Sequence, residues 1–351
     1  MDQMVSIAGR EIGVNYPPFV IAELSGNHQQ SLALAKQMIA AAAQAGADAI
    51  KLQSYTADSM TLDCDNEDFV IQEQDSLWKG QRLHALYQKA ATPYEWHAEL
   101  FSYAHSLGLI AFSSPFDKQA VDLLASLNVP CYKIASFELT DLPLIAYVAQ
   151  QGQPVILSTG MASLAEIEEA VNTVKAQGNQ QIILLKCTST YPASAANSHL
   201  RTLPHLQQSF NCVVGLSDHT QGIGAAVASV ALGASVIEKH FVLDRQAGGV
   251  DAAFSLEPAE LGALCEASKV AQQALGRVCY GGSEAEEQAK YYRRSIYLKR
   301  PIAVGEAFTE QNIQVVRPAK GLAPKYWDMV LGKKARQALP AGTALSWEHL
   351  A

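Results

Sequence analysis

The stretch FVIAELSGNHQQSLALAKQMIAAAAQAGADAIKLQSY, residues 19–55, decides the fold of this 351-residue chain. An apolar run at 19–25 leads into a segment with helical apolar spacing at 31–45, which Gly46 ends. A second apolar run follows at 49–55. This order predicts a strand, a helix and a second strand, and each predicted strand ends in polar residues.

Six further runs of the same kind follow, each ending in polar or reactive residues. They read IAFSSPF (110–116), CYKIASFE (131–138), VILSTGM (155–161), IILLKCTS (182–189), VVGLSDHT (213–220) and VIEKHF (236–241). Helix-like segments separate the runs, and the weakest of them lies between 189 and 213. Eight strand–helix alternations predict a (β/α)8 TIM barrel, in which the carboxyl ends of the strands share one site.

The composition fits a globular protein with a large core, because 49% of residues are hydrophobic and 17% are charged. A net charge of −8 argues against nucleic acid as a partner. No apolar stretch approaches the roughly 18 residues that span a membrane, and no secretory signal is visible. The six cysteines form no CxxC pair, which is typical of a reducing compartment, so we expect a cytoplasmic protein.

The chain is expected to divide near residues 276–290, where the Gly- and Glu-rich segment GRVCYGGSEAEEQAKYY begins. We expect a barrel at 1–276, a linker at 277–290 and a small β-rich module at 291–351. A second unusual segment is the long acidic stretch at 56–92. Long loops in compact domains are usually functional, so this stretch is expected to rise over the site.

Barrel closure predicts which strand ends meet. Strands eight and two would flank strand one, placing Glu23 between His240 and Lys51, with His219 beside His240. Two imidazoles and a carboxylate suit a divalent metal that keeps open positions for water and substrate oxygens. The alternative is that each histidine is a core residue satisfied by hydrogen bonds.

Lys51 and Lys133 lie inside apolar runs, where an unpaired ammonium is costly. Each therefore needs a carboxylate partner or an anionic ligand. With the hydroxyls of Ser136 and Ser158 they suit a phosphate and a carboxylate on one small ligand. A buried ion pair of Glu23 with Lys51 and a Schiff base on Lys133 remain alternatives.

Other polar residues permit two interpretations. Glu138 is either an acid–base group near the site or a helix N-terminal acid. Arg293 and Arg294 form either a guanidinium fork for a ligand or a solvated basic surface. Three acids are expected to be structural rather than catalytic: Asp218, Asp244 and Asp251.

Nine strings resemble the sialic acid synthase family: IAELSGNH, AIKLQSYTAD, AFSSPFD, KIASFE, ILSTGMA, KCTSTYPA, GLSDHT, EKHFVLDR and FSLEP. The tail, with RRSIYL, VGEAFTEQNI, RPAKGL and PAGTAL, resembles the antifreeze-like (SAF) domain of these synthases. The resemblance implies a TIM barrel followed by a small β-rich SAF domain. It also implies condensation of phosphoenolpyruvate with an N-acetylated hexose.

The resemblance further implies a role for each matching position. His219 and His240 would bind a divalent metal, Mn2+ first, with Mg2+ or Co2+ as alternatives. Glu23 and Glu138 would be the catalytic acids, and the phosphoenolpyruvate contacts would be Lys51, Lys133, Ser136 and Ser158, with Gln53, Ser189 and Tyr191 nearby. Arg294 of a partner subunit would contact the sugar, which implies a homodimer with domain-swapped C-terminal domains.

Within the family, the motifs LWKG, TPYEWH and RQAGGVDAAFSLEP look most like the pseudaminic acid synthases, whose sugar is 2,4-diacetamido-2,4,6-trideoxy-L-altrose. Leu24-Ser25 and Ser189 depart from the neuraminate synthase pattern, which has Ile-Gly and Asn at these places. A neuraminate or legionaminate synthase is the alternative. A non-catalytic sugar- or anion-binding module is the rival from another class.

Overall fold

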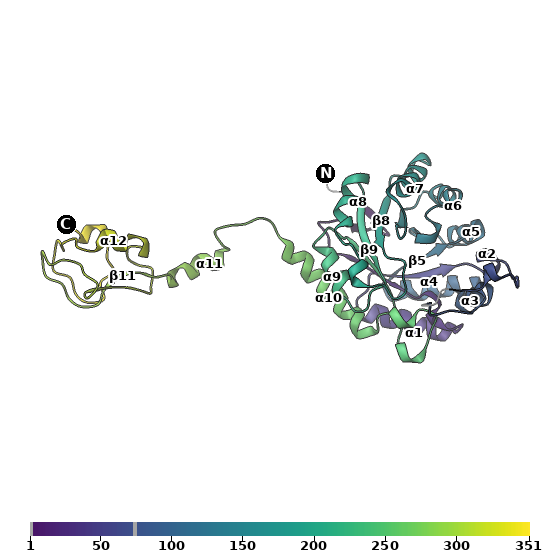
Figure 1. Cartoon of the computed structure of the whole chain (residues 1–351), viewed down its shortest axis with the longest axis horizontal. Helices are drawn as coiled ribbons and strands as arrows, with labels where there is room; N and C mark the ends of the chain where they lie inside the picture. The colour runs from purple at the N-terminus through teal and green to yellow at the C-terminus, as the bar shows by residue number, and fades with distance from the viewer. Residues whose placement is uncertain (1–2, 73–75) are drawn as a thin grey trace. The chain divides into compact units, whose positions relative to one another are not determined.

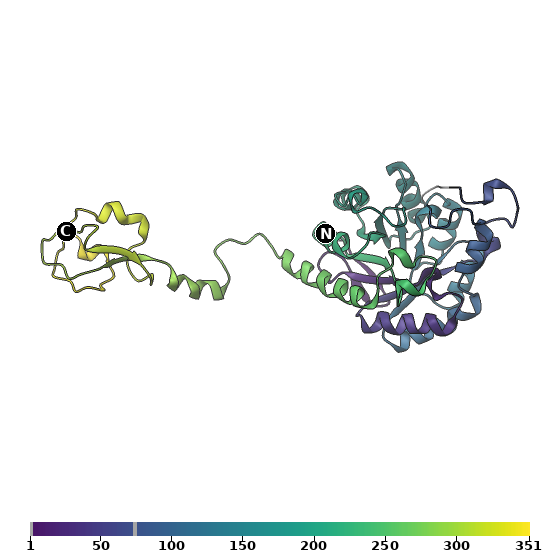
Figure 2. The same ribbon diagram turned by 60° about the horizontal axis from the view of Figure 1, so that its bottom comes forward.

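The computed structural model describes residues 3–72 and 76–351, which form two compact units, Met1–Gly276 and Arg277–Ala351. Figures 1 and 2 show the first unit as a ring of strands surrounded by helices. The segment 277–290, expected to be a linker, falls in the second unit and contains the helix α11 (Glu284–Ala289).

Eight parallel strands form a closed barrel, which confirms the predicted fold. Each strand pairs with its sequence neighbour, and the last pairs with the first. The strands are β3 (Phe19–Glu23), β4 (Ala49–Ser54), β5 (Ile110–Pro115), β6 (Tyr132–Ile134), β7 (Val155–Ser158), β8 (Ile182–Cys187), β9 (Val213–Asp218) and β10 (Val236–His240).

One main helix follows each barrel strand, and several begin at side chains that cap the free N–H groups of the first turn. Ser31, Asp117, Asp141 and Ser163 accept hydrogen bonds from the backbone three residues later. The helices are α1 (Leu32–Gln44), α4 (His97–Ser106), α5 (Lys118–Ser126), α6 (Leu142–Ala149), α7 (Leu164–Ala176), α8 (Thr202–Phe210), α9 (Gly224–Val230) and α10 (Pro258–Leu275).

Two helices differ from the sequence-based expectation. The weakest predicted segment contains a full helix, α8, packed on β8 and β9. The helix that follows the stretch 56–92 begins only at His97, because a 3-10 turn at Tyr94–Trp96 comes first. The long stretch 56–92 contains α2 (Ala57–Met60), a 3-10 turn at Glu67–Phe69 and α3 (Leu83–Ala90).

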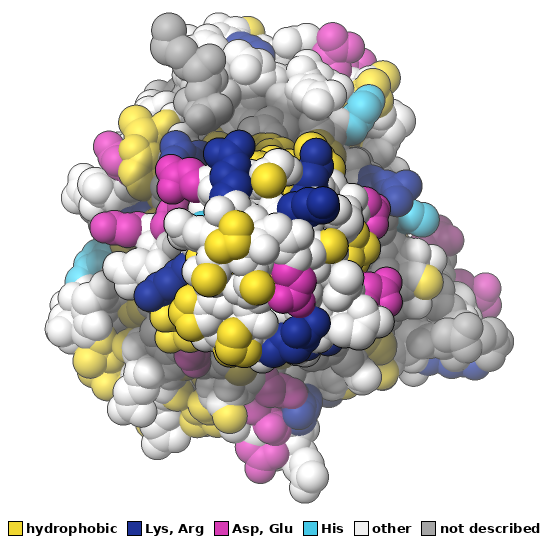
Figure 3. Space-filling model, turned by 90° about the vertical axis from the view of Figure 1, so that its left-hand side faces the viewer, with side chains coloured by type: hydrophobic (Ala, Val, Ile, Leu, Met, Phe, Trp, Pro, Cys, Tyr) yellow, Lys and Arg dark blue, Asp and Glu magenta, His cyan; other side chains and the backbone are white. Residues whose placement is uncertain are grey.

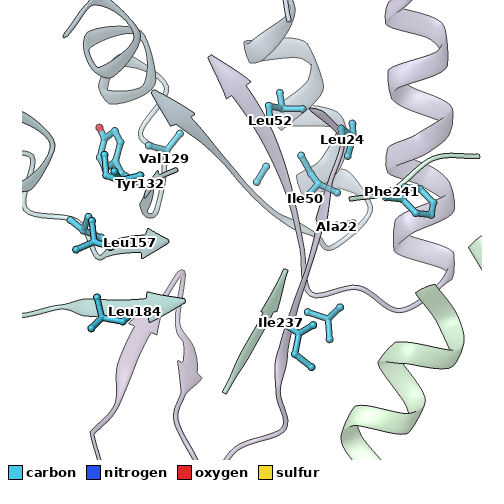
Figure 4. Packing of buried hydrophobic residues seen from close by; sticks show 14 of the residues in the cluster. Ala22, Leu24, Ile50, Leu52, Val129, Tyr132, Leu157, Leu184, Ile237 and Phe241 are labelled. Carbon is cyan, nitrogen blue, oxygen red and sulfur yellow. The ribbon is translucent and has the colours of Figure 1, made fainter. Parts of the chain in front are cut away.

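The outward faces of the strands pack against the helices and form the main core. Figure 4 shows part of this layer, with Ala22, Ile50, Leu157 and Ile237 on four different strands. All four are fully buried. Burial of this alternating apolar set contributes roughly 25 cal/mol per Å2 and holds the strand ends in fixed register.

The inward faces near the amino-terminal ends of the strands are also apolar. Phe19, Ile21 and Phe112 belong to this inner cluster, together with residues of an N-terminal hairpin, β1 (Val5–Ile7) and β2 (Arg10–Ile12). The hairpin therefore seals the bottom of the barrel. No pattern in the sequence predicted this hairpin.

The C-terminal unit has its own core, which includes Ile296, Phe308, Ile313 and Leu345. Its elements include the antiparallel pair β11 (Ser295–Leu298) and β12 (Ile313–Val316) and the short helix α12 (Trp327–Val330). On the face drawn in Figure 3, Lys and Arg side chains lie among hydrophobic ones.

All six cysteines are free thiols, and four of them are buried. Within residues 3–72 and 76–351, none of the helices combines the length and the hydropathy that a membrane crossing needs.

Candidate active site

The strand register places Glu23 between an imidazole and an ammonium group. Residue Glu23 of β3 pairs with His240 of β10 on one side and with Lys51 of β4 on the other. This is the arrangement that barrel closure predicts. Since all three side chains point inward near the carboxyl ends of the strands, they share one space at the top of the barrel.

Two ammonium groups and two carboxylates form a buried charged centre. Lys51 Nζ lies 2.5 Å from Glu23 Oε2 and 3.2 Å from Glu238 Oε2. Lys133 Nζ lies 3.3 Å from Glu238 Oε1. The ion pair between Glu23 and Lys51 anticipated from the sequence is therefore present, but Glu238, which was not a candidate, joins both lysines.

The carboxylates of this centre retain acceptor capacity. Apart from the ammonium groups that they face, both oxygens of Glu23 and Oε2 of Glu238 are buried without a hydrogen-bond donor in the described part of the chain. The ammonium groups are thus close enough for charge attraction without saturating the carboxylates. A polar ligand can take up these free acceptor positions.

Burial sets the ionisation of the centre. It lowers the pKa of Lys51 to about 7, although the Glu238 carboxylate acts in the opposite direction. Burial by itself would raise the pKa of Glu238, but Lys133 and Lys51 outweigh that effect and hold this pKa well below its usual range. Glu238 is therefore a permanent anion between two lysines.

His219 and His240 lie side by side at the rim, with ring centroids 5.2 Å apart and planes inclined by 60°. Nδ1 of His219 is 3.0 Å from the carbonyl oxygen of Thr188, and Nδ1 of His240 is 3.4 Å from Asp251 Oδ2. The Thr188 carbonyl orients the His219 ring, and the Asp251 carboxylate faces His240 Nδ1 without completing a hydrogen bond. A partner at Nδ1 leaves Nε2 as a lone-pair donor, the usual arrangement for a metal-ligating histidine. The donor set therefore fits a divalent ion.

No cluster of three or more His, Cys, Asp or Glu side chains suited to a metal occurs among the residues that the structure describes. Two imidazoles alone would leave most coordination positions to water and substrate oxygens, as the sequence analysis expected.

The three acids expected to be structural have different positions. Asp218 pairs with Lys239 on the outward face of the barrel, and Asp244 caps a 3-10 turn by accepting from Gln246 N at 2.8 Å. Asp251 lies in the site instead, where it faces His240 and accepts a hydrogen bond from Ser25 Oγ. Asp251 belongs to a loop and not to a barrel strand, so strand alternation does not predict its place at the rim, and only the tertiary structure shows it.

Hydroxyl groups surround Gly160, which lies just after β7, two strands away from β9 in the barrel. Gly160 N donates to Ser136 Oγ at 3.1 Å, and a Cβ atom at this position would overlap the hydroxyls of Ser136 and Ser189. Ser158 Oγ and Ser114 Oγ are buried with no hydrogen-bond partner within 3–72 and 76–351. Hydroxyl groups that converge on one place and have no hydrogen-bond partner can donate to an oxyanion.

Ser114 was not among the candidates named from the sequence, although strand alternation predicts that its side chain points into the barrel. It alternates with Phe112 along β5, which places both on the inward face. Its register partner is Gln53, a half-buried residue two positions beyond Lys51 on β4.

A cysteine lies below the hydroxyls. Cys187 Sγ is 3.7 Å from Ser189 Oγ and 3.9 Å from His219 Nδ1. Burial would raise the pKa of this thiol, but His219, Ser136 and Ser189 lower it to about 6.

Aromatic rings line the rim beside the imidazoles. Tyr191 lies 4.6 Å from the His219 ring and 5.2 Å from Phe254. Trp78 lies 6.2 Å from Tyr191, and its indole N–H donates to the carbonyl of Val250 at 3.2 Å. The stretch after β4 thus reaches the site, as its length predicted.

Glu138 ends a 3-10 turn directly after β6. Burial raises the pKa of this carboxyl to about 7, against the smaller effects of a backbone hydrogen bond and of Lys133. Arg293 and Arg294 belong to the C-terminal unit, in which both are exposed.

The NeuB family matches residues 38–280, and the SAF domain matches residues 293–351. The first match covers more than half of the chain. The protein therefore belongs to the NeuB family and ends in a SAF domain, which confirms the resemblance seen in the sequence.

Relatives place the chain more closely within this family. The pseudaminic acid synthase of Campylobacter jejuni is 44% identical over 327 residues, which cover 93% of this chain and 95% of the relative. The N,N'-diacetyllegionaminic acid synthase of the same organism is 39% identical, covering 90% and 95%. The crystal structure of an N-acetylneuraminic acid synthetase from Leptospira borgpetersenii superposes with a TM-score of 0.74 at 32% identity, covering 84% of this chain and 97% of that one.

Proposed function

We propose that the chain is a pseudaminic acid synthase. It condenses phosphoenolpyruvate with 2,4-diacetamido-2,4,6-trideoxy-L-altrose and water, giving pseudaminic acid and phosphate. The observation that carries the proposal is the 44% identity with a pseudaminic acid synthase over 93% of this chain. The 39% identity with a legionaminic acid synthase makes the same chemistry on another hexose the second candidate.

In this proposal His219 and His240 hold a divalent metal ion, Mn2+ first, with Mg2+ or Co2+ as alternatives. The Thr188 carbonyl and the Asp251 carboxylate, which face their Nδ1 atoms, support this role. When bound, such an ion supplies Lewis acidity that polarises a carbonyl group.

Phosphoenolpyruvate would bind beside the imidazoles, through its phosphate and carboxylate. Lys51 and Lys133 supply cationic groups, and the buried hydroxyls of Ser136, Ser158 and Ser189 supply donors around Gly160. Gln53, Tyr191 and the unpaired Ser114 complete the set. Buried donors of this kind favour an anion because water competes weakly for them.

The reaction forms one C–C bond and breaks one bond of the phosphate ester. C3 of phosphoenolpyruvate attacks the aldehyde carbon of the open-chain sugar, whose oxygen gains a proton. Water adds to C2 and loses a proton, and the tetrahedral intermediate then loses phosphate and becomes a ketone. Lys51 and Lys133 stabilise the negative charge that leaves with the phosphate.

Two carboxyl groups are assigned to the proton transfers. Glu138 has a pKa raised to about 7 by burial, so both its acid and base forms are present near neutral pH. Glu23 lies between His240 and Lys51; its Oε2 pairs with the Lys51 ammonium, and its Oε1 has no partner in the described part of the chain and is available to orient water. Fixed groups in a water-poor site need little reorganisation during the reaction.

A Schiff base on Lys133 is less well supported. That chemistry needs an amine free to attack a carbonyl carbon, whereas Lys133 Nζ lies 3.3 Å from Glu238 Oε1 in an ion pair. Borohydride treatment in the presence of substrate would leave a covalent adduct if Lys133 acted in this way.

The partner in this proposal is a second copy of the chain, whose C-terminal domain caps the barrel and contributes Arg294. The opposite net charges of the two units support the pairing. Residues 1–276 contain 27 Asp and Glu and 14 Lys and Arg, whereas residues 277–351 contain seven Asp and Glu and 12 Lys and Arg. Phe137 and Met161, exposed apolar residues just after β6 and β7, would be covered in this arrangement. Six free thiols favour the cytoplasm.

The test of the function is a phosphate-release assay on the full-length protein with a panel of N-acetylated hexoses. We expect the altrose derivative to be turned over fastest, with activity lost in EDTA and restored by Mn2+. Faster turnover of the legionaminate precursor or of N-acetylmannosamine would reject the assignment. Binding of phosphoenolpyruvate with no turnover of any sugar would favour a binding module.

The swapped arrangement is tested by mixed dimers of His240→Ala and Arg294→Ala chains. If each tail serves the partner's barrel, one site of the mixed dimer has intact components. Activity then recovers to about half that of the wild type, while both parent homodimers stay inactive. No recovery in purified mixed dimers would show that each tail serves its own barrel.

A further inference from the structure

A buried lysine lies on the outward face of the strand that carries His240, and its side chain does not enter the candidate site. Lys239 precedes His240 on β10, but its side chain points to the outward face of the barrel. The residue is only 1% exposed. An ammonium group in this position requires a full set of partners.

Lys239 Nζ has three such partners, all in the chain around His219. It donates to Asp218 Oδ2 at 2.9 Å, to the carbonyl oxygen of Thr220 at 2.6 Å and to that of Gly222 at 2.9 Å. An ammonium group has three N–H donors, so its capacity is fully used.

Asp218 closes the same network across His219. Its carboxylate accepts from the backbone N–H of Thr220 at 3.0 Å and from the Thr220 hydroxyl at 3.1 Å. The residues on both sides of His219 are therefore tied to each other and to Lys239. We call Lys239, Asp218 and Thr220 the rear clamp.

The rear clamp links the two strand ends that carry the imidazoles. Lys239 and Asp218 are direct register partners between β10 and β9, and each is followed by one of the histidines. On the inward face, Ser217 Oγ donates to Glu238 Oε1 at 3.0 Å, which joins the same two strands a second time. A change in the clamp would displace His219 relative to His240.

Stability alone does not account for this choice of residues. A buried ion pair is often no more stabilising than well-packed apolar side chains of the same volume. What apolar side chains cannot do is hold two backbone carbonyls and a carboxylate in fixed directions. The directional property of the clamp is therefore the one that matters for the site.

We propose that Lys239 is a positioning residue that sets the separation of His219 and His240 for binding of a divalent ion. The inference rests on the proposed function, which assigns the metal to these two imidazoles. Removing the clamp lowers metal affinity without touching a ligand. Residues that orient metal ligands typically contribute about 10- to 100-fold to affinity.

The experiment measures Mn2+ binding by full-length protein stripped with EDTA, using the electron paramagnetic resonance signal of free Mn2+. The variants are Lys239→Met and Thr220→Val, which removes only the hydroxyl contact with Asp218. The matched control is Ile237→Ala, which removes a fully buried side chain on the same outward face of β10. Thermal unfolding of each metal-free protein measures the loss of stability, and Co2+ absorption spectra report the ligand geometry.

For Lys239→Met we expect the Kd for Mn2+ to rise at least about tenfold and the Co2+ spectrum to change. Ile237→Ala is expected to lower the unfolding temperature comparably while keeping the Kd within about twofold of the wild type. Equal Kd values for Lys239→Met, Ile237→Ala and the wild type would overturn the proposal.

If Lys239→Met does not fold, Thr220→Val decides the question. We expect its Kd to rise at least about threefold, the value of one modest hydrogen bond. An unchanged Kd and Co2+ spectrum would reject the clamp as a positioning device. If the wild-type protein itself binds neither Mn2+ nor Co2+, the proposed metal site fails instead, which is a distinct result.

Discussion

The lower and upper halves of the barrel interior differ sharply, although the same eight strands build both. Near the amino-terminal ends, inward side chains such as Phe19, Ile21 and Phe112 pack with the N-terminal hairpin. Near the carboxyl ends, the inward positions hold Lys51, Glu238 and the other charged groups. The lower half stabilises the barrel, whereas the upper half keeps polar atoms ready for a ligand.

The difference shows how a barrel separates stability from chemistry along one strand. On β3, three residues in succession on the inward face run from Phe19 through Ile21 to Glu23. Each step of two residues moves about 6–7 Å toward the site. Burial of the apolar side chains Phe19 and Ile21 offsets the free-energy cost of burying the charged Glu23 at the end of the strand.

The largest expected effect comes from removing an imidazole in the upper half. His240→Ala should lower kcat/KM by at least about 10^3-fold, because an electrostatic stabiliser of the transition state is lost. The imidazole is buried and packs against Phe254, so the unfolding temperature should fall modestly, and activity is compared well below it. Steady-state phosphate release and thermal unfolding measure the two quantities, and unchanged activity would remove His240 from the mechanism.

In the lower half the pattern should reverse. Phe112→Ala removes a fully buried ring from the apolar floor and should lower the free energy of unfolding by about 3–4 kcal/mol. The kcat of the protein that remains folded should stay near that of the wild type. Urea unfolding, with activity measured well below the midpoint, tests this, and a proportional loss of kcat would argue against separate roles for the halves.

A smaller effect of opposite sign is expected at Glu138. Because burial raises its pKa from 4.5 to about 7, the folded state binds more protons than the unfolded state between these values. Wild-type stability therefore falls as pH rises through that window. Glu138→Gln should be more stable than the wild type at pH 8, by up to about 3 kcal/mol, and equal to it below about pH 4.5.

Denaturant unfolding of the metal-free proteins at several pH values measures this difference. The same substitution should slow phosphate release, since a proton-transfer group is lost. A Glu138→Gln protein that is as active as the wild type, or that gains no stability at pH 8, would show that this carboxyl is an ordinary helix N-terminal acid.

Much of the fold could be predicted because apolar periodicity follows directly from helix and strand geometry. The helix α1 spans 32–44 and the strand β4 begins at Ala49, as the helical spacing at 31–45 and the apolar run at 49–55 indicated. The N-terminal hairpin could not be predicted in this way. Its two strands of three residues are too short to show a period, and only their packing under the barrel stabilises them.

The candidate site was predictable where a residue's role depends on strand order alone. Closure of the barrel gave the neighbours of Glu23 correctly. Glu238 was missed as a partner of Lys51 and Lys133, although it stands two residues before His240 and therefore shares its face of the strand. Alternation gives the face of a side chain, whereas the choice of ion pair depends on distances across the barrel.

The sequence by itself determined the barrel, the SAF domain, the family and the inward direction of the polar strand ends, since all of these follow from local periodicity and motifs. Only the tertiary structure decided which charges pair, that Asp251 faces His240, and that Lys239 holds the chain around His219. The physical reason is that buried charges and hydrogen bonds depend on separations of a few ångströms between residues far apart in the chain. Strand tilt and helix packing, rather than any local sequence pattern, fix those separations.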